Sequence, residues 1–207
     1  SMAAERETLA AECYPTTLAD GVEHHLEGDY NRFNVAAAVA VGRYFGVDDE
    51  RIRYAVGSYR PDNHRSQKIR TGQNTLILDC YNANPSSMQA SLVNFRQEPL
   101  EGCTRKILIL GDMLELGGMS APAHEELGRQ AAEAGLTALV TYGPEAARTA
   151  KAAKDAGLAD VVHAEDYQQA ADALLARMAP GDALLVKASR GMALEKALAL
   201  FYPVCAK

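Results

Sequence analysis

Near its centre the sequence reads Leu76-Ile77-Leu78-Asp79-Cys80-Tyr81-Asn82-Ala83-Asn84-Pro85. The apolar run at its start is typical of a buried strand, and it stops at an acid. Asn84 is a good helix N-cap, and proline suits the next position because its missing N–H costs nothing there. The stretch predicts a strand, a polar turn and a helix, with Asp79 at the carboxyl end of the strand, where open α/β sheets bind ligands. The alternative is a capped turn that binds nothing.

Downstream of residue 66 short apolar segments alternate with amphipathic ones. This alternation predicts an α/β fold, a Rossmann-like and mostly parallel sheet with helices on both faces. Strands are expected at Thr75–Leu78, Lys106–Leu110, Ala138–Thr141, Asp160–His163 and Ala183–Val186. Helices are expected at Pro85–Arg96, Ala121–Ala134, Pro144–Ala156, Tyr167–Met178 and Met192–Leu200. Right-handed crossovers would then place all the parallel strand ends at one edge.

Three polar loops are expected at that edge. One follows Asp79, one spans residues 111–117, and one carries Lys187, Ser189 and Arg190. The last of these supplies three donors within four residues, which suits a carboxylate or a phosphate. One such loop is unremarkable, but three at one edge favour a binding cleft.

Other polar residues give weaker signals. Asp112 and Glu115 either bind a cation or a ligand amine, or form a solvated pair. His124 has two glutamates directly after it and is expected at the surface. No CxxC pair occurs among the four scattered cysteines, and no histidine pattern suggests a metal site. The cysteine usage fits a reducing cytoplasm.

The part of the chain before this alternation is predicted to be helical. Residues 3–28 lack an apolar stripe and are interpreted as a segment whose packing partners lie outside the chain. A strong helix follows, with Asn31 and Asn34 on one face near its N-terminus. Because that end favours anions, the two amides either help to bind phosphate or only cap and pack.

A second short helix leads to a polar, proline-bearing stretch at residues 60–67, which is interpreted as a hinge between two domains. Arg65 lies in this hinge. It is either a solvated charge or a phosphate ligand, since arginine matches phosphate with paired donors. The expected domains are residues 1–61 and 62–207.

Composition excludes several classes of function. A net charge of −6 argues against a nucleic-acid partner, and no apolar run reaches membrane-spanning length.

Ser1-Met2 is interpreted as a scar of tag removal. The sequence contains no GxxxxGK[ST] phosphate loop, no GxGxxG fingerprint and no G-x-S-x-G nucleophile elbow. The residues therefore predict a polar cleft without a complete catalytic apparatus.

Five motifs, in order, resemble those of the Mur ligases of peptidoglycan synthesis. They are Gly28-Asp29-Tyr30-Asn31-Arg32-Phe33-Asn34, Asn63-His64-Arg65-Ser66-Gln67, Asp79-Cys80-Tyr81-Asn82-Ala83-Asn84-Pro85, Gly111-Asp112-Met113-Leu114-Glu115-Leu116-Gly117 and Lys187-Ala188-Ser189-Arg190. The last three are similar to the branch that adds D-alanyl-D-alanine. The resemblance begins near Glu27, and it departs at Tyr30, where many members have histidine.

Such ligases have three domains, and this sequence resembles only the end of the second and all of the third. The resemblance therefore implies a C-terminal fragment, in which residues 1–61 are a helical remnant of the central ATP-binding domain and residues 62–207 are the C-terminal domain. The missing N-terminal and central domains would be partners of this chain. They would supply the phosphate loop and the Mg²⁺ ligands, so the fragment alone is expected to be inactive, and no metal ligand is expected within it.

The resemblance also implies a reaction and roles for individual residues. ATP would convert the carboxylate of a UDP-N-acetylmuramoyl tripeptide into an acyl phosphate, and the amine of D-Ala-D-Ala would displace phosphate. Arg65 and Asp79 would be the catalytic pair, with Arg65 on ATP phosphate and Asp79 on the ribose. Asn31 and Asn34 would also bind ATP. The substrate-binding residues would be Tyr81, Asn82, Asn84, Lys187, Ser189 and Arg190.

Two alternatives stay open on the sequence. The first is another Mur ligase or a folylpolyglutamate-type ligase that adds a different amino acid. The second is an α/β module that binds a nucleotide or a carboxylate and catalyses nothing. A phosphate loop in the upstream coding sequence would favour a ligase over the second alternative.

Overall fold

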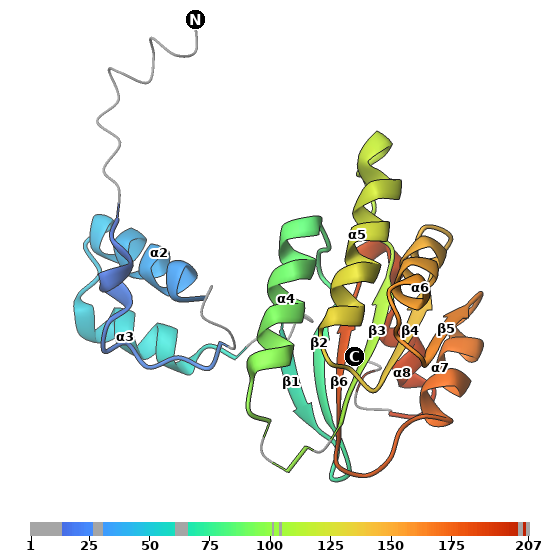
Figure 1. The fold of residues 1–207 in the computed structure, drawn as a ribbon. Helices are drawn as coiled ribbons and strands as arrows, with labels where there is room; N and C mark the ends of the chain where they lie inside the picture. The colour runs from blue at the N-terminus through green and yellow to red at the C-terminus, as the bar shows by residue number, and fades with distance from the viewer. Residues whose placement is uncertain are drawn as a thin grey trace, which may run out of the picture. The chain divides into compact units, whose positions relative to one another are not determined.

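The structure is a computed structural model that describes residues 14–26, 31–60, 66–100, 102–103, 105–202 and 205. The chain divides into two compact units, Ser1–Pro61 and Asp62–Lys207, which Figure 1 shows in blue to cyan and in green to red. Each unit has a hydrophobic core of its own.

The first unit consists of a 3₁₀ turn, η1 (Thr16–Ala19), and two helices, α2 (Asn31–Tyr44) and α3 (Asp49–Ser58). The side chain of Asp48 caps α3 by accepting from the N–H groups of Glu50 and Arg51. The small core contains Ala19, Val35, Ala36, Val39 and Ile52, with Leu18, Val22 and Leu26 packed against it. The prediction that residues 3–28 lack partners in the chain is thus wrong for residues 14–26, since their apolar side chains pack on α2 and α3.

The second unit is a six-stranded sheet in the order β1-β2-β6-β3-β4-β5. Its strands are β1 (Gln67–Arg70), β2 (Thr75–Asp79), β3 (Arg105–Gly111), β4 (Ala138–Tyr142), β5 (Val161–Ala164) and β6 (Asp182–Lys187). Only β1 is antiparallel to its neighbour. The prediction of a mostly parallel α/β fold is confirmed. The edge strand β1 was not predicted, because its polar sequence was assigned in part to the hinge.

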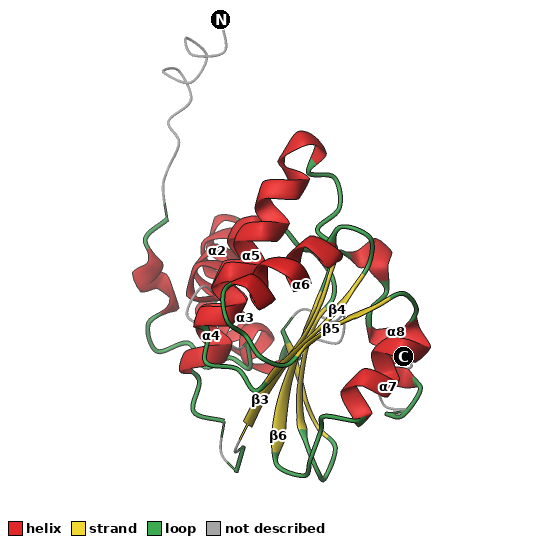
Figure 2. Ribbon diagram, turned by 45° about the vertical axis from the view of Figure 1, so that its right-hand side comes forward, coloured by secondary structure: helices red, strands yellow, loops and turns green. Residues whose placement is uncertain are grey.

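Helices cover both faces of this sheet, as Figure 2 shows. They are α4 (Pro85–Gln97), α5 (Ser120–Glu133), α6 (Ala146–Asp155), α7 (Tyr167–Leu175) and α8 (Glu195–Ala199), with the short 3₁₀ turns η2 (Gly117–Met119) and η3 (Arg190–Met192). The last helix is shorter than predicted, because η3 and a left-handed residue, Ala193, precede it. Among the described residues, no helix combines the length and hydropathy that a membrane span requires.

Alternation along the strands builds two cores. In β3, Leu108 and Leu110 face α4, α5 and α6, while Ile107 and Ile109 face α7 and α8. This period of two is what a sheet buried on both faces requires. The strands therefore form a rigid frame that fixes the positions of the loops at their ends.

Replacement of Gly128 by alanine should destabilise the fold. A Cβ at this position of α5 would lie 2.4 Å from the backbone oxygen of Thr149 and 2.9 Å from the backbone nitrogen of Ala153, both in α6. Alanine gains up to about 1 kcal/mol in helix propensity. The overlap with backbone should outweigh that gain and lower the free energy of unfolding by about 1–3 kcal/mol in urea titrations. Gly118→Ala is the control, since no atom lies within 4 Å of its Cβ. Equal stability of the two variants would refute the close packing of α5 on α6.

Candidate functional site at the carboxyl edge of the sheet

Three polar loops meet at the carboxyl ends of β2, β6 and β3. These strands are adjacent and parallel, and Lys187 lies opposite both Asp79 in β2 and Leu110 in β3. The loops that follow the three strands consequently start side by side. This confirms the expectation that these loops share one edge.

Lys187, which is buried, and Asp79, which is largely buried, form an ion pair at this edge. Lys187 Nζ lies 2.6 Å from Asp79 Oδ2, and the two side chains are 3% and 14% exposed. The ammonium group also donates to the carbonyl oxygen of Asn82 at 3.0 Å. The carboxylate of Asp79 accepts in addition from Ser91 Oγ at 3.0 Å and from the Ser66 N–H at 3.3 Å. This ion pair thus connects β2 and β6 with helix α4, with the residue before β1 and with the loop after β2.

The loop after β2 leads into helix α4 as predicted. Asn84 caps the helix by accepting from the Ser87 N–H at 2.9 Å, and Ser87 Oγ accepts from the Asn84 N–H at 3.0 Å. Asn84 Oδ1 also accepts from Ser86 Oγ. Tyr81 and Asn82 are exposed. In this loop the side chains of Tyr81 and Asn82 are exposed, whereas the side-chain oxygen of Asn84 caps the helix.

Ser189, in the loop after β6, forms hydrogen bonds to the loops after β2 and β3. Its hydroxyl donates to the carbonyl of Ala83 at 3.4 Å and accepts from the Leu114 N–H at 2.9 Å. Its own N–H donates to the carbonyl of Asp112 at 3.1 Å. Ser189 is buried. The side chain that the sequence suggested as a ligand donor is therefore engaged with backbone of both neighbouring loops.

Asp112 is buried and belongs to the scaffold. Its Oδ1 accepts from the Ala146 N–H at 2.7 Å, at the start of α6. Burial raises the pKa of this carboxyl, and the N–H groups of Ala146 and Glu145 oppose that shift. A Cβ on Gly143, whose φ is +113°, would lie 2.5 Å from Asp112 Oδ1, so glycine lets the backbone approach the carboxylate closely. The idea of a solvated pair with Glu115 is wrong, because only Glu115 is exposed.

His124 is completely buried, so the prediction of a surface position is wrong. Its Nε2 accepts from the Met113 N–H at 3.0 Å, which makes Nδ1 the protonated nitrogen and the donor to the Ser120 carbonyl at 2.8 Å. The signal for burial was present in the sequence. His124, Leu127 and Ala131 recur at helical spacing and share the buried stripe of α5.

Arg190 and Glu195 form a second ion pair beside the loops. Arg190 Nη1 lies 2.6 Å from Glu195 Oε1, and the side chains are 55% and 7% exposed. No role for Glu195 was predicted from the sequence. A single acid among Leu194, Ala197 and Leu198, five residues after an arginine, was the available signal for a buried ionic partner.

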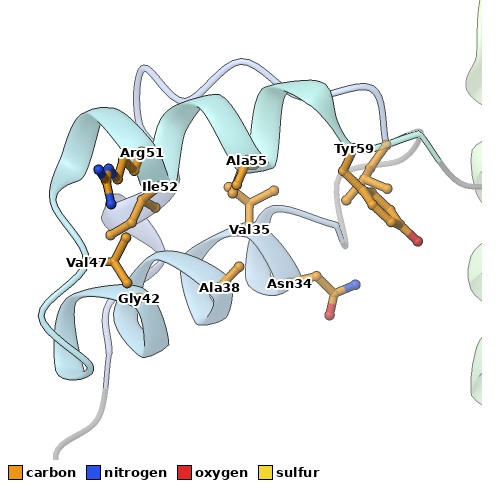
Figure 3. Close-up of a pocket in the computed structure, with 11 residues that line it drawn as sticks. Asn34, Val35, Ala38, Gly42, Val47, Arg51, Ile52, Ala55 and Tyr59 are labelled. Carbon is orange, nitrogen blue, oxygen red and sulfur yellow. The ribbon is translucent and has the colours of Figure 1, made fainter.

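In the first unit, Asn34 Nδ2 donates to Asn31 Oδ1 at 2.8 Å, which confirms that the two amides share a face. Asn31 is buried, and Asn34 lines a pocket of about 480 Å³ between α2 and α3 (Figure 3). The pocket is otherwise mostly apolar, with Val35, Ile52 and Tyr59 among its lining residues. Arg65, the second predicted catalytic residue, lies outside the described residues.

The described residues do not fit a magnesium site. No group of three or more histidine, cysteine, aspartate or glutamate side chains within them is arranged to hold a metal ion. Asp79 and Asp112 are instead committed to Lys187 and to the start of α6.

Comparison with known proteins gives a consistent result. Residues 64–190 match the family model described as "Mur ligase, glutamate ligase domain". The UDP-N-acetylmuramoyl-tripeptide–D-alanyl-D-alanine ligase of Bacillus subtilis is 36% identical over 171 residues, which are 82% of this chain and 37% of that protein. The chain thus spans little more than a third of the length of this relative.

Solved structures agree with this match. The MurF ligase of Thermotoga maritima in complex with ADP is 27% identical with a TM-score of 0.66, and the alignment covers 84% of this chain and 38% of that one. MurF of Acinetobacter baumannii is also 27% identical, with a TM-score of 0.72 and coverage of 87% and 38%. With well over half of its residues inside the family model, the chain belongs to the Mur ligase family.

Proposed function

We propose that this chain is the C-terminal part of an ATP-dependent peptide ligase that adds D-Ala-D-Ala to a UDP-N-acetylmuramoyl tripeptide in the cytoplasm. Mur ligases are ATP-dependent ligases. The observation that carries the proposal is 36% identity over 82% of the chain to a relative named for this reaction. A relative of the same fold in complex with ADP supports the use of ATP.

The proposed reaction has two steps. The terminal carboxylate of the tripeptide attacks the γ-phosphorus of ATP, so that an acyl phosphate forms and ADP leaves. The amine of D-Ala-D-Ala then attacks the acyl carbon, loses a proton and displaces inorganic phosphate. The protein would hold the reactants in line and exclude water, which accounts for much of the acceleration in reactions of this kind.

Two groups of residues would serve these steps. Asp79 and Arg65, with Asn31 and Asn34, would contact ATP. Tyr81, Asn82, Asn84, Lys187, Ser189 and Arg190 would form the side that receives peptide and dipeptide. Within this second set, Tyr81, Asn82 and Arg190 have exposed side chains, and we propose that these three touch a substrate. Lys187, Ser189 and Asn84 would act by holding the loops, because their polar atoms bond to protein groups.

The two compact units would belong to different domains of the ligase. Residues 1–61 would be the end of the central ATP-binding domain, and residues 62–207 the C-terminal domain. Mg²⁺ would neutralise charge on the transferring phosphoryl group, bound by residues outside this chain. The rest of the ligase would therefore be this chain's obligate partner.

The proposal is tested by phosphate release from the full-length protein that contains this chain. We expect release that requires ATP, the UDP-linked tripeptide and D-Ala-D-Ala together. Phosphate release is also measured with single amino acids, glutamate among them, in place of the dipeptide. A preference for one of these amino acids would indicate another ligase of the family.

The 207-residue chain alone should release no phosphate above background under the same conditions. The physical reason is that its sequence contains no GxxxxGK[ST] loop to cradle the ATP phosphates. Phosphate release is measured over a titration of each substrate, with the full-length protein as the positive control. Turnover by the chain alone that depends on the dipeptide would overturn this expectation.

A further inference from the structure

The turn that carries Arg190 is fixed through its backbone. Tyr167 OH donates to the carbonyl of Met192 at 2.8 Å, from the first residue of α7. The Ala193 N–H closes the turn on the Arg190 carbonyl at 3.1 Å, and Ala193 itself adopts a left-handed conformation with φ of 42°. These contacts set the direction in which the side chain of Arg190 leaves the backbone.

Glu195 fixes the other end of that side chain. It is the first residue of α8, whose Ala197 and Leu198 are part of the core. Its carboxylate lies near two buried thiols. Burial first, and the charge of Glu195 next, raise the pKa of Cys80, and the same two causes raise the pKa of Cys205 to about 11. The side chain of Glu195 is held in place, because the close-packed core around it leaves it little rotamer freedom.

The pair is strongly asymmetric in exposure. The side chain of Glu195 is 7% exposed and that of Arg190 is 55% exposed, with 2.6 Å between Oε1 and Nη1. The Nη1 atom of the guanidinium therefore contacts a buried acid, although more than half of the Arg190 side chain is exposed in the loop that follows β6. Guanidinium presents its donors in a rigid fork, so anchoring one nitrogen orients the others.

We infer that Glu195 is a positioning residue, which holds the guanidinium of Arg190 ready to receive an oxyanion, a carboxylate or a phosphoryl group, of a substrate. This inference rests on the proposed ligase function and adds to it a residue that acts through another. Preorganisation lowers the ordering cost that binding would otherwise carry. Both chemical sources of the oxyanion are present in the proposed reaction, as the terminal carboxylate of the dipeptide and the phosphoryl groups of ATP and of the UDP-sugar peptide.

The test is a double-mutant cycle in the full-length ligase, with KM measured separately for the three substrates. Glu195→Gln keeps the size of the side chain but removes its charge, and Arg190→Gln keeps a donor toward residue 195. We expect Glu195→Gln to raise KM for one substrate by about three- to tenfold, since a charge-assisted hydrogen bond becomes a neutral one. The substrate affected identifies the oxyanion, and kcat should change less than KM.

The coupling in the cycle separates positioning from general destabilisation. Because Glu195 acts through Arg190, adding Glu195→Gln to Arg190→Gln should produce no further rise in KM. Glu165→Gln is the matched control, since Glu165 is exposed in the loop before α7. Independent, additive effects, or unchanged KM values in Glu195→Gln at unchanged melting temperature, would overturn the inference.

A second readout does not depend on catalysis. In the 207-residue chain, the Nε–H group of Arg190 should give an ordered NMR signal with a high heteronuclear NOE, and Glu195→Gln should make it mobile. If the full-length protein shows no ligase activity, the proposed function fails and this readout still decides the inference. Equal order of Arg190 in both proteins would overturn it.

Discussion

Lys187→Met should lower the free energy of unfolding of this chain by about 3 kcal/mol or more, near the 3–5 kcal/mol typical of a broken buried ion pair. Methionine fills nearly the same space, so loss of packing is a minor factor. The cost arises because the Asp79 carboxylate loses the ammonium group 2.6 Å away. The Asn82 carbonyl loses its donor as well. The measurement is urea unfolding at neutral pH, followed by circular dichroism.

Two comparisons isolate the charge effect. Asp79→Asn with Lys187→Met removes both charges and should recover most of the lost stability, since an ion pair replaced as a whole is often neutral for stability. Lys151→Met breaks an exposed pair with Asp155 on α6 and should cause no measurable change. If the double variant were as unstable as Lys187→Met, the loss would come from packing and not from an uncompensated carboxylate.

The sequence was a good guide to the fold because its local signals agree with one another. Apolar runs bounded by turn residues located five of the six strands, and Pro85 after Asn84 located the start of α4. The strand β1 escaped because Gln67–Arg70 is polar and only partly buried, as an edge strand often is. The packing of the segment around Thr16–Ala19 was missed because its sequence shows no apolar stripe, and the core that it forms with α2 and α3 becomes visible only in the folded chain.

Predicting the candidate site was harder, because the roles of its residues depend on pairs distant in sequence. The edge and its three loops follow from strand order and handedness. The ion pair between Lys187 and Asp79 does not follow from them. The two residues are 108 positions apart, and only the register of β2 and β6 brings them together. His124 and Glu195 show the same limit for buried polar groups. Helical spacing gives the burial of His124, but its partner, the backbone of Met113, becomes known only in the folded chain.

Asp79 should carry the largest functional effect of the residues proposed to contact ATP. Its side chain is 14% exposed, and Lys187 and Ser91 both contact the same oxygen, Oδ2. Within the part of the chain that the structure describes, the other oxygen, Oδ1, accepts a long bond of 3.3 Å from the Ser66 N–H. A ribose hydroxyl could donate to that oxygen. In the full-length ligase, Asp79→Asn should raise KM for ATP by about ten- to a hundredfold, the range of one or two hydrogen bonds to a charged group.

A raised KM in Asp79→Asn alone would have two possible causes, the lost contact with ATP and a disturbed ion pair. The substitution also leaves Lys187 buried without its counter-charge. The variant with both Asp79→Asn and Lys187→Met resolves this, since it should regain stability while it still lacks the carboxylate. We expect its KM for ATP to stay as high as that of Asp79→Asn, and Lys187→Met, which keeps the carboxylate, to change KM far less. A double variant with both stability and KM for ATP restored would show that Asp79 only supports the scaffold. The same comparison would then confine ATP recognition to residues outside this ion pair.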